Sequence, residues 1–231
     1  MNNPAPAARR PAGVPSRATG RGSGWPVPAT LIALSAIPLI AGAFRLVQLA
    51  GGPATIPADD RFTFPAPLVV HIAGAALYAL VGAFQFVPRI RRNHPNWHRR
   101  AGRVVAVAGL LVAGSALWMT LLYSQKPGTG DLLYVLRLVF AAAMAGSLVL
   151  GFAAVRRRDI ARHRAWMIRA YAIGLAAGTQ AFTEGIAVAA FGDGELVGDL
   201  AKGAGWVINL AVAECLIRRR PSRRAGPAPA A

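Results

Sequence analysis

The chain has 231 residues, of which 55% are hydrophobic and only 15% charged, and its mean hydropathy is +0.42. This composition excludes a disordered or collagen-like chain and is too apolar for an ordinary soluble domain. Lysine and arginine outnumber aspartate and glutamate by 26 to 9, which gives a net charge of +17 and leaves nucleic acid or a membrane surface as the attracting partner. The single cysteine, Cys215, excludes an intramolecular disulfide and a paired-cysteine metal site.

Both ends of the chain are basic tails. Residues 1–26 are rich in proline, alanine, glycine and arginine and lack apolar periodicity, so we expect them to be disordered. The apolar run that follows begins too late and is too long for a signal peptide. We therefore predict a membrane domain over residues 27–217, between the first tail and a second basic tail over residues 218–231.

Six apolar stretches follow the first tail, and each is about long enough to cross a hydrocarbon core of ~30 Å. They cover residues 27–50, 67–87, 103–123, 133–155, 166–191 and 200–217. The predicted fold class is all-α, a polytopic bundle of six transmembrane helices.

The charges alternate between the connections. The two tails and the two connections around residues 89–103 and 156–169 hold 21 of the 26 basic residues. The other connections are acidic and contain Asp59, Asp60, Asp131, Asp193, Glu195 and Asp199 against only Arg61, Lys126 and Lys202. Positively charged loops stay in the cytoplasm, so we expect both termini to be cytoplasmic in the inner membrane of a bacterium. The basic segments then face anionic lipid headgroups, and nucleic acid is not expected as a partner.

The two cytoplasmic hairpins resemble each other. Gly82 precedes an arginine cluster and a His-Arg pair at His98, and Gly151 precedes an arginine cluster and a His-Arg pair at His163. A glycine follows each histidine after eleven positions. This pattern indicates a duplicated helical hairpin of parallel topology.

Four segments carry a resemblance to a known family. They are His-Ile-Ala-Gly at 71–74, Phe-Val-Pro-Arg at 86–89, Trp-His-Arg-Arg-Ala-Gly-Arg at 97–103 and Asp-Ile-Ala-Arg-His-Arg-Ala-Trp-Met-Ile-Arg-Ala-Tyr at 159–171. Over residues 67–182 the chain resembles the predicted bacterial membrane proteins of domain of unknown function 2306. The resemblance implies a multi-span fold and a membrane location, but it brings no established activity.

One candidate site lies at the cytoplasmic end. Pro95 suits the first position of one helix and Asp159 the N-cap of another, so His98 and His163 each occupy the first turn of a predicted helix. Equal depth on two helices is what axial ligation of one b-type haem requires. Neighbouring arginines would be available for the propionates. The alternative is that both histidines are interfacial residues within loops whose arginines serve topology.

A second candidate site lies at the outer end of the bundle. It consists of the polar or charged residues that the predicted orientation places at similar depth: Arg45, His71, Arg137, Gln180 and Glu184. Arginines and a histidine suit an anionic ligand or a proton step, so our leading hypothesis is a binding or transport protein. A charge inside the membrane needs a partner, and we expect Glu184 to be held against Arg137 or Arg45. A purely structural network is the alternative.

No nucleotide-binding, hydrolase or zinc motif occurs in the chain, and no metal site is expected, so enzymatic activity stays uncertain. A redox protein with haem is the second hypothesis, and a structural or assembly partner, including a homo-oligomer, is the third. Near the inner end, Glu214 is expected to contact Arg169 or an arginine of the C-terminal tail.

Overall fold

The computed structural model describes residues 25–57 and 59–219, so the predicted tails lie almost entirely outside the described residues. Within these ranges the chain forms eight helices and no strand. The helices are α1 (Pro26–Leu49), α2 (Ala66–Gln85), α3 (Pro88–Asn93), α4 (Pro95–Leu122), α5 (Asp131–Arg156), α6 (Ile160–Gly174), α7 (Ala176–Phe191) and α8 (Glu195–Arg218).

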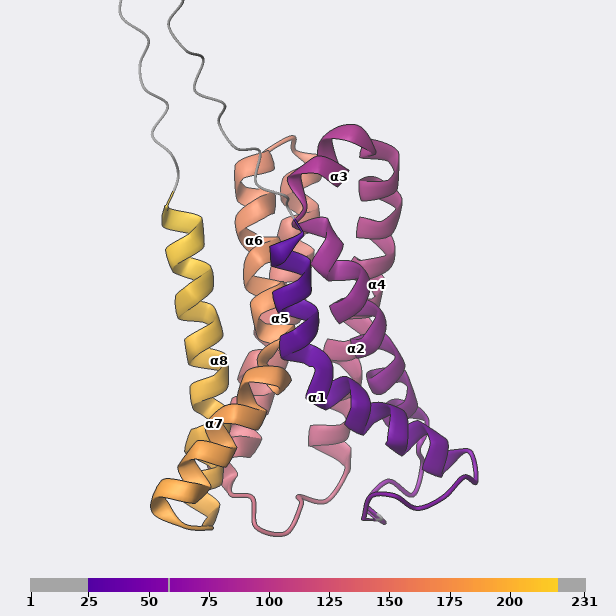
Figure 1. Cartoon of the computed structure of the whole chain (residues 1–231), viewed down its shortest axis with the longest axis vertical. Helices are drawn as coiled ribbons and strands as arrows, with labels where there is room; N and C mark the ends of the chain where they lie inside the picture. The colour runs from indigo at the N-terminus through magenta and orange to yellow at the C-terminus, as the bar shows by residue number, and fades with distance from the viewer. Residues whose placement is uncertain (1–24, 58, 220–231) are drawn as a thin grey trace, which may run out of the picture.

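Five of these helices are long and apolar enough to cross a membrane: α1, α2, α4, α5 and α8. The sixth crossing is made by α6 and α7 in tandem, and α7 leaves α6 at an angle (Figure 1). The predicted all-α membrane bundle is therefore confirmed. The single helix expected over residues 166–191 is wrong, because α6 ends at Gly174 and α7 begins at Ala176, with a turn at Leu175 between them.

Local sequence explains where the helices begin and bend. Proline occupies the first position of α1, α3 and α4, where its missing N–H would be unpaired anyway. The side chain of Asp159 accepts a hydrogen bond from the Arg162 N–H at 2.9 Å and caps α6, as expected from the sequence. Pro38 lies inside α1, which changes direction near its middle (Figure 1).

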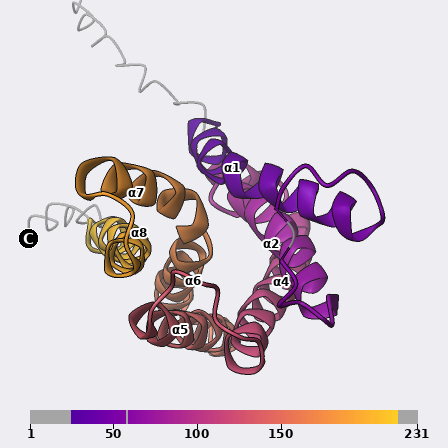
Figure 2. The same cartoon turned by 90° about the horizontal axis from the view of Figure 1, so that it is seen from below.

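Seen along their axes, α2, α4, α5 and α6 form an arc, with α1 beside α2 and with α7 and α8 on the other side of α6 (Figure 2). The most extensive helix pairs are α2 with α4, α5 with α6, and α7 with α8, while α4 also packs on α5 and α1 on α2 and α7. The first two pairs are the two hairpins that the sequence pattern relates to each other.

Tyr78 is at the centre of the packing and is 3% exposed. A Cβ at Gly109 would lie 2.6 Å from its Cε2, and a Cβ at Gly174 would lie 2.7 Å from its Cε1. The two glycines therefore leave room for the ring between α4 and α6. Tyr171 and Tyr78 have ring centroids 5.4 Å apart, so aromatic side chains fill the bundle at this level.

The break between α6 and α7 is stabilised from α8. In a continuous helix the Ala172 carbonyl would accept the Ala176 N–H, but here it accepts Asn209 Nδ2 at 3.0 Å. Asn209 Oδ1 also accepts the Thr179 hydroxyl at 2.8 Å. One side chain thus satisfies polar groups on both sides of the break, which a helix inside a membrane requires.

Candidate functional site

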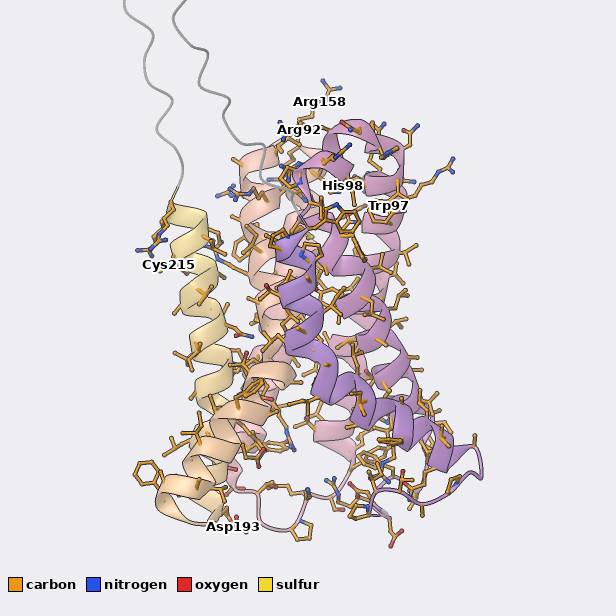
Figure 3. All side chains as sticks on the ribbon, in the orientation of Figure 1. Arg92, Trp97, His98, Arg158, Asp193 and Cys215 are labelled. Atoms are coloured by element: carbon orange, nitrogen blue, oxygen red, sulfur yellow. The ribbon has the colours of Figure 1, made fainter. Side chains whose placement is uncertain are left out.

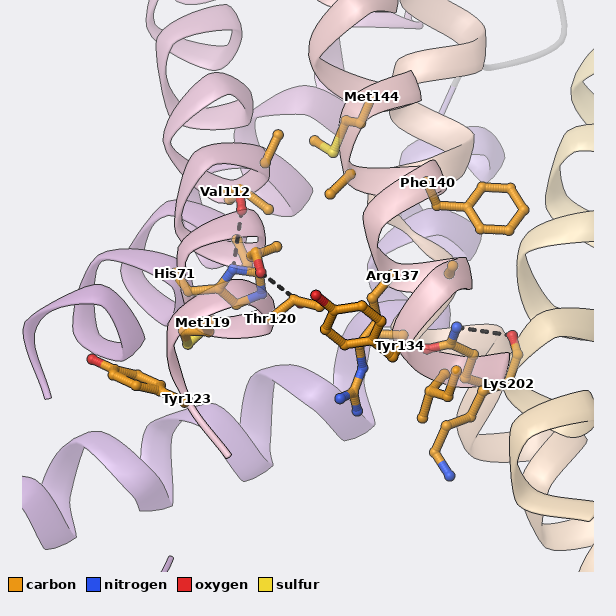
Figure 4. Close-up of a pocket in the computed structure, with 18 of the residues that line it drawn as sticks. His71, Val112, Met119, Thr120, Tyr123, Tyr134, Arg137, Phe140, Met144 and Lys202 are labelled. Atoms are coloured by element: carbon orange, nitrogen blue, oxygen red, sulfur yellow. Dashed lines mark hydrogen bonds between the residues drawn. The ribbon is translucent and has the colours of Figure 1, made fainter. Parts of the chain in front are cut away.

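A cavity of about 400 Å³ opens between α2, α4, α5, α7 and α8, at the end of the bundle that carries the α4–α5 loop. Figure 4 shows His71 on one side of it and Arg137, Phe140 and Lys202 on the other. Ser124, from the loop, lines the outer part. Its volume is within the roughly 300–1,000 Å³ typical of small-molecule sites.

The lining of this cavity contains three cationic side chains and, among the described residues, no carboxylate: Arg61, Arg137 and Lys202. Arg61 binds Asp59 through Nη2 at 2.6 Å, and this hydrogen-bonded pair lowers the pKa of Asp59 below its usual value. Lys202 Nζ forms an ion pair with Glu184. Two of the three cations are thus paired with carboxylates that do not line the cavity, and the charge of the third, Arg137, gives the lining its positive character.

Arg137 differs from the other two cations. In the described part of the chain, no salt bridge or hydrogen bond engages its guanidinium group. Asp199 is near enough for its charge to act on Arg137. Its carboxylate oxygens, however, accept the N–H groups of Gly130 and Leu133 at 3.1 Å and 3.0 Å. The Arg137 guanidinium therefore retains its donors for a ligand.

Three of the five residues predicted for the outer site line this one cavity: His71, Arg137 and Gln180. Arg45 does not join them, because its guanidinium bonds Gln48 Oε1 at 2.8 Å and the Pro57 carbonyl at 2.9 Å. Glu184 lies outside the lining.

The expected partner of Glu184 was wrong. It pairs with Lys202 rather than with Arg137 or Arg45. The sequence interpretation assigned Lys202 to an outer loop, whereas it lies inside α8, which begins at Glu195. Since α7 and α8 form a hairpin, a cation on α8 reaches Glu184 more readily than one on α5.

One wall of the cavity is apolar and aromatic. Phe140 and Trp206 stack with ring centroids 4.7 Å apart and an interplanar angle of 13°. Met144 and Ile173 continue this surface toward Gly174, which touches the Tyr78 ring. The inner end of the cavity is therefore closed by packed side chains, and the polar groups gather toward the other end.

The cavity is lined at matching positions of the two hairpins. When Gly82 is aligned with Gly151, the matching lining residues are Leu68 with Arg137, His71 with Phe140, and Ala75 with Met144. Within each helix these three positions are separated by three, four and seven residues, so they lie on one face of α2 and on the matching face of α5. This supports the duplicated hairpin and shows that each hairpin contributes one strongly polar residue at this level.

Asp199 is a second residue whose role the sequence did not reveal. It is 1% exposed and accepts backbone N–H groups at the start of α5. From the sequence, Asp199 was interpreted as one of the acidic residues of the outer connections, whose charge indicates the orientation of the protein in the membrane. Its position four residues after Glu195, inside an amphipathic stretch, was the available signal that it belongs to α8.

The cytoplasmic histidines lie outside this cavity. His163 Nδ1 is 2.8 Å from the Gly151 carbonyl, and His163 lies near enough to His98 for their charges to interact. His98 Nδ1 is buried and has no hydrogen-bond partner within the described residues. At the same end, Arg169 binds Glu214 at 2.5 Å and 3.1 Å, and Arg218 Nε lies 3.9 Å from the same carboxylate, so both partners expected for Glu214 are present.

The family described as predicted membrane protein (DUF2306) matches residues 68–217, which is more than half of the chain. The chain belongs to this family. Every residue of the cavity from His71 onward falls within the matched range, so the site is part of the DUF2306 region itself. No curated protein and no solved structure matches the chain.

Proposed function

We propose that this DUF2306 protein binds a small amphipathic anion in the outer cavity. The observation that carries the proposal is the Arg137 guanidinium, which lines the cavity without a carboxylate or hydrogen-bond acceptor among the described residues. On insertion scales an arginine costs about 2.5–3.5 kcal/mol at the centre of a membrane helix, so a guanidinium within a span is unfavourable without a partner. A bound anion would offset that cost.

The chemistry of the lining selects the charge of the ligand. A guanidinium presents several N–H donors in a planar fork that matches a carboxylate or phosphate bidentately. No carboxylate lines the described cavity, so nothing in its lining offsets the charge of Arg137; Lys202 lies on the same side of the cavity and is paired with Glu184. A cationic ligand would be repelled by the same groups.

The apolar part of the lining selects the rest of the molecule. The stacked rings of Phe140 and Trp206, together with Met144, offer an apolar surface beside the charged end. A ligand with an anionic group and a short apolar or aromatic body would cover both parts. Its passage through the membrane would require Tyr78 to leave the gap between Gly109 and Gly174, so the proposal is for binding.

The test compares benzoate with benzyl alcohol, which has similar size but no charge. In non-ionic detergent, benzoate should raise the thermal midpoint of the wild-type protein, because a ligand that binds only the folded state stabilises it. Arg137→Gln should weaken benzoate binding roughly tenfold or more, as expected for losing charged hydrogen bonds. The matched control is Arg100→Gln, an exposed arginine at the other end of α4. Equal benzoate binding by the two variants would refute the proposal.

The location of the protein is inferred from its charges. Arg92 and Arg158 lie at one end of the bundle and Asp193 at the opposite end (Figure 3), which agrees with the charge alternation along the sequence. A bacterial inner membrane, cytoplasmic termini and contacts of the arginine-rich end with anionic headgroups stay predictions from that pattern.

A second candidate function is haem binding by His98 and His163. It is favoured by the hydrogen bond from His163 to the Gly151 carbonyl, since ligating histidines commonly donate their other ring nitrogen to a carbonyl. Purified protein expressed with ample haem should then show a Soret band, lost in His98→Ala and His163→Ala and kept in His71→Ala. A wild-type protein without that band would rule this function out.

A further inference from the structure

His71 is held in one tautomer by its neighbours. Its Nδ1 atom lies 3.1 Å from Ser115 Oγ and 3.2 Å from the Val112 carbonyl. The Ser115 hydroxyl donates its own proton to the Leu111 carbonyl at 2.7 Å or to the Val112 carbonyl at 3.0 Å. Because the Val112 carbonyl can only accept, we assign the proton of the neutral ring to Nδ1, and the Ser115 hydroxyl is then its second acceptor.

With Nδ1 protonated, the Nε2 atom of a neutral ring is an acceptor. His71 lines the cavity, and within the described chain no hydrogen bond engages Nε2. The His71 side chain is only partly buried, and its Nε2 atom can be reached from the cavity. A positive charge on this ring would face Arg137 with no carboxylate in the described lining, which favours the neutral form.

His71 and Arg137 come from opposite sides of the cavity (Figure 4). They therefore present two different polar groups to one bound molecule: a donor fork from α5 and an acceptor nitrogen from α2. The aromatic wall of Phe140 and Trp206 lies on the α5 and α8 side.

We infer that the ligand is a hydroxy acid whose carboxylate binds Arg137 and whose hydroxyl group donates a hydrogen bond to His71 Nε2. This inference rests on the proposed function and adds the second polar group of the ligand. An acceptor that a bound ligand covers without giving it a donor is unfavourable, so a site built this way prefers the hydroxylated acid over the same acid without the hydroxyl. His71 is then a specificity-determining residue and Arg137 the anchor.

The experiment measures the dissociation constants of benzoate, 3-hydroxybenzoate, 4-hydroxybenzoate and their methoxy counterparts by calorimetry in non-ionic detergent. At least one hydroxybenzoate should bind the wild-type protein two- to tenfold more tightly than benzoate, which is the range of one neutral hydrogen bond. Its methoxy counterpart, which has no proton to donate, should show no such advantage.

His71→Phe should abolish the hydroxyl preference while benzoate still binds. Phenylalanine already occupies the matching position of the second hairpin, at Phe140, so this side chain suits the register. The matched control is His94→Phe, an exposed histidine in the arginine-rich loop, which should keep the preference. Ser115→Ala, which removes one of the two acceptors that fix the tautomer, should reduce the preference without touching the ligand.

Two results would overturn the inference. Hydroxybenzoates that bind the wild-type protein no better than benzoate and the methoxy acids would show that His71 Nε2 receives no donor, even if His71→Phe fails to fold. A hydroxyl preference that persists in a folded His71→Phe protein would show that the acceptor of the ligand hydroxyl is not His71. In both cases benzoate binding that depends on Arg137 leaves the proposed function standing, whereas binding of none of these acids removes the function and the inference together.

Discussion

Gly178→Ala will lower the thermal stability of the protein strongly, because it forces α1 away from α7. A Cβ at Gly178 would lie 2.1 Å from the Leu34 carbonyl oxygen and 2.9 Å from its carbon. These are backbone atoms of α1, and no side-chain rotation can relieve the overlap. Overpacking typically costs about 1–3 kcal/mol, and a displacement of whole helices should place this variant at or above the upper end.

The matched control is Gly185→Ala, two turns further along the same helix. A Cβ at Gly185 would meet nothing within 4 Å. Alanine also favours the helix by about 1 kcal/mol over glycine, so this variant should be neutral or slightly stabilised. The thermal midpoints of both variants in the same detergent decide the matter. Equal midpoints would mean that α1 does not pack on α7 as closely as the structure shows.

Asp199→Ala will be the second strongly destabilising change. The carboxylate is buried, and it accepts the N–H of Gly130 at 3.1 Å and that of Leu133 at 3.0 Å at the start of α5. Removing it leaves two backbone donors without acceptors and removes the negative charge that acts on Arg137. Each unsatisfied buried group costs about 1–3 kcal/mol, so the total should be about 3 kcal/mol or more.

Two further substitutions separate the causes. Asp199→Asn keeps one acceptor oxygen and loses the charge, so it should fall between the wild-type protein and Asp199→Ala. Asp193→Ala removes an exposed acid at the same end of the bundle and should change the thermal midpoint little. An Asp199→Ala protein as stable as the Asp193→Ala protein would show that this carboxylate does not hold the start of α5.

Several local features could be predicted from the sequence with good reason. Hydropathy alone indicated the membrane class, and Pro95 and Asp159 marked the starts of α4 and α6 because both act through bonds within one turn. The contact between Arg169 and Glu214 could also be anticipated, since these residues were the ionisable groups expected at similar depth near the inner end. Each of these inferences depends on spacing along one helix or on depth in the membrane.

The predictions that were wrong depended on how each helix is rotated about its axis and on which helices are its neighbours. Depth placed Arg45, Arg137 and Glu184 together, but depth does not say which helices are adjacent. Glu184 pairs with Lys202 because α7 and α8 form a hairpin. The bend at Leu175 was equally hidden, since it depends on Asn209 of α8 taking the Ala172 carbonyl.

The amino-acid sequence by itself therefore determined that this chain is a membrane helix bundle, where most of its spans lie and which residues are candidates for a site, because hydropathy, caps and charge act locally. Only the tertiary structure decided that His71, Arg137 and Gln180 share one cavity, that Glu184 is neutralised by Lys202, and that Arg137 keeps its donors for a ligand. Those results depend on which faces of helices meet across long stretches of chain, and in lipid that choice is made by close packing and by satisfying buried polar groups rather than by hydrophobicity.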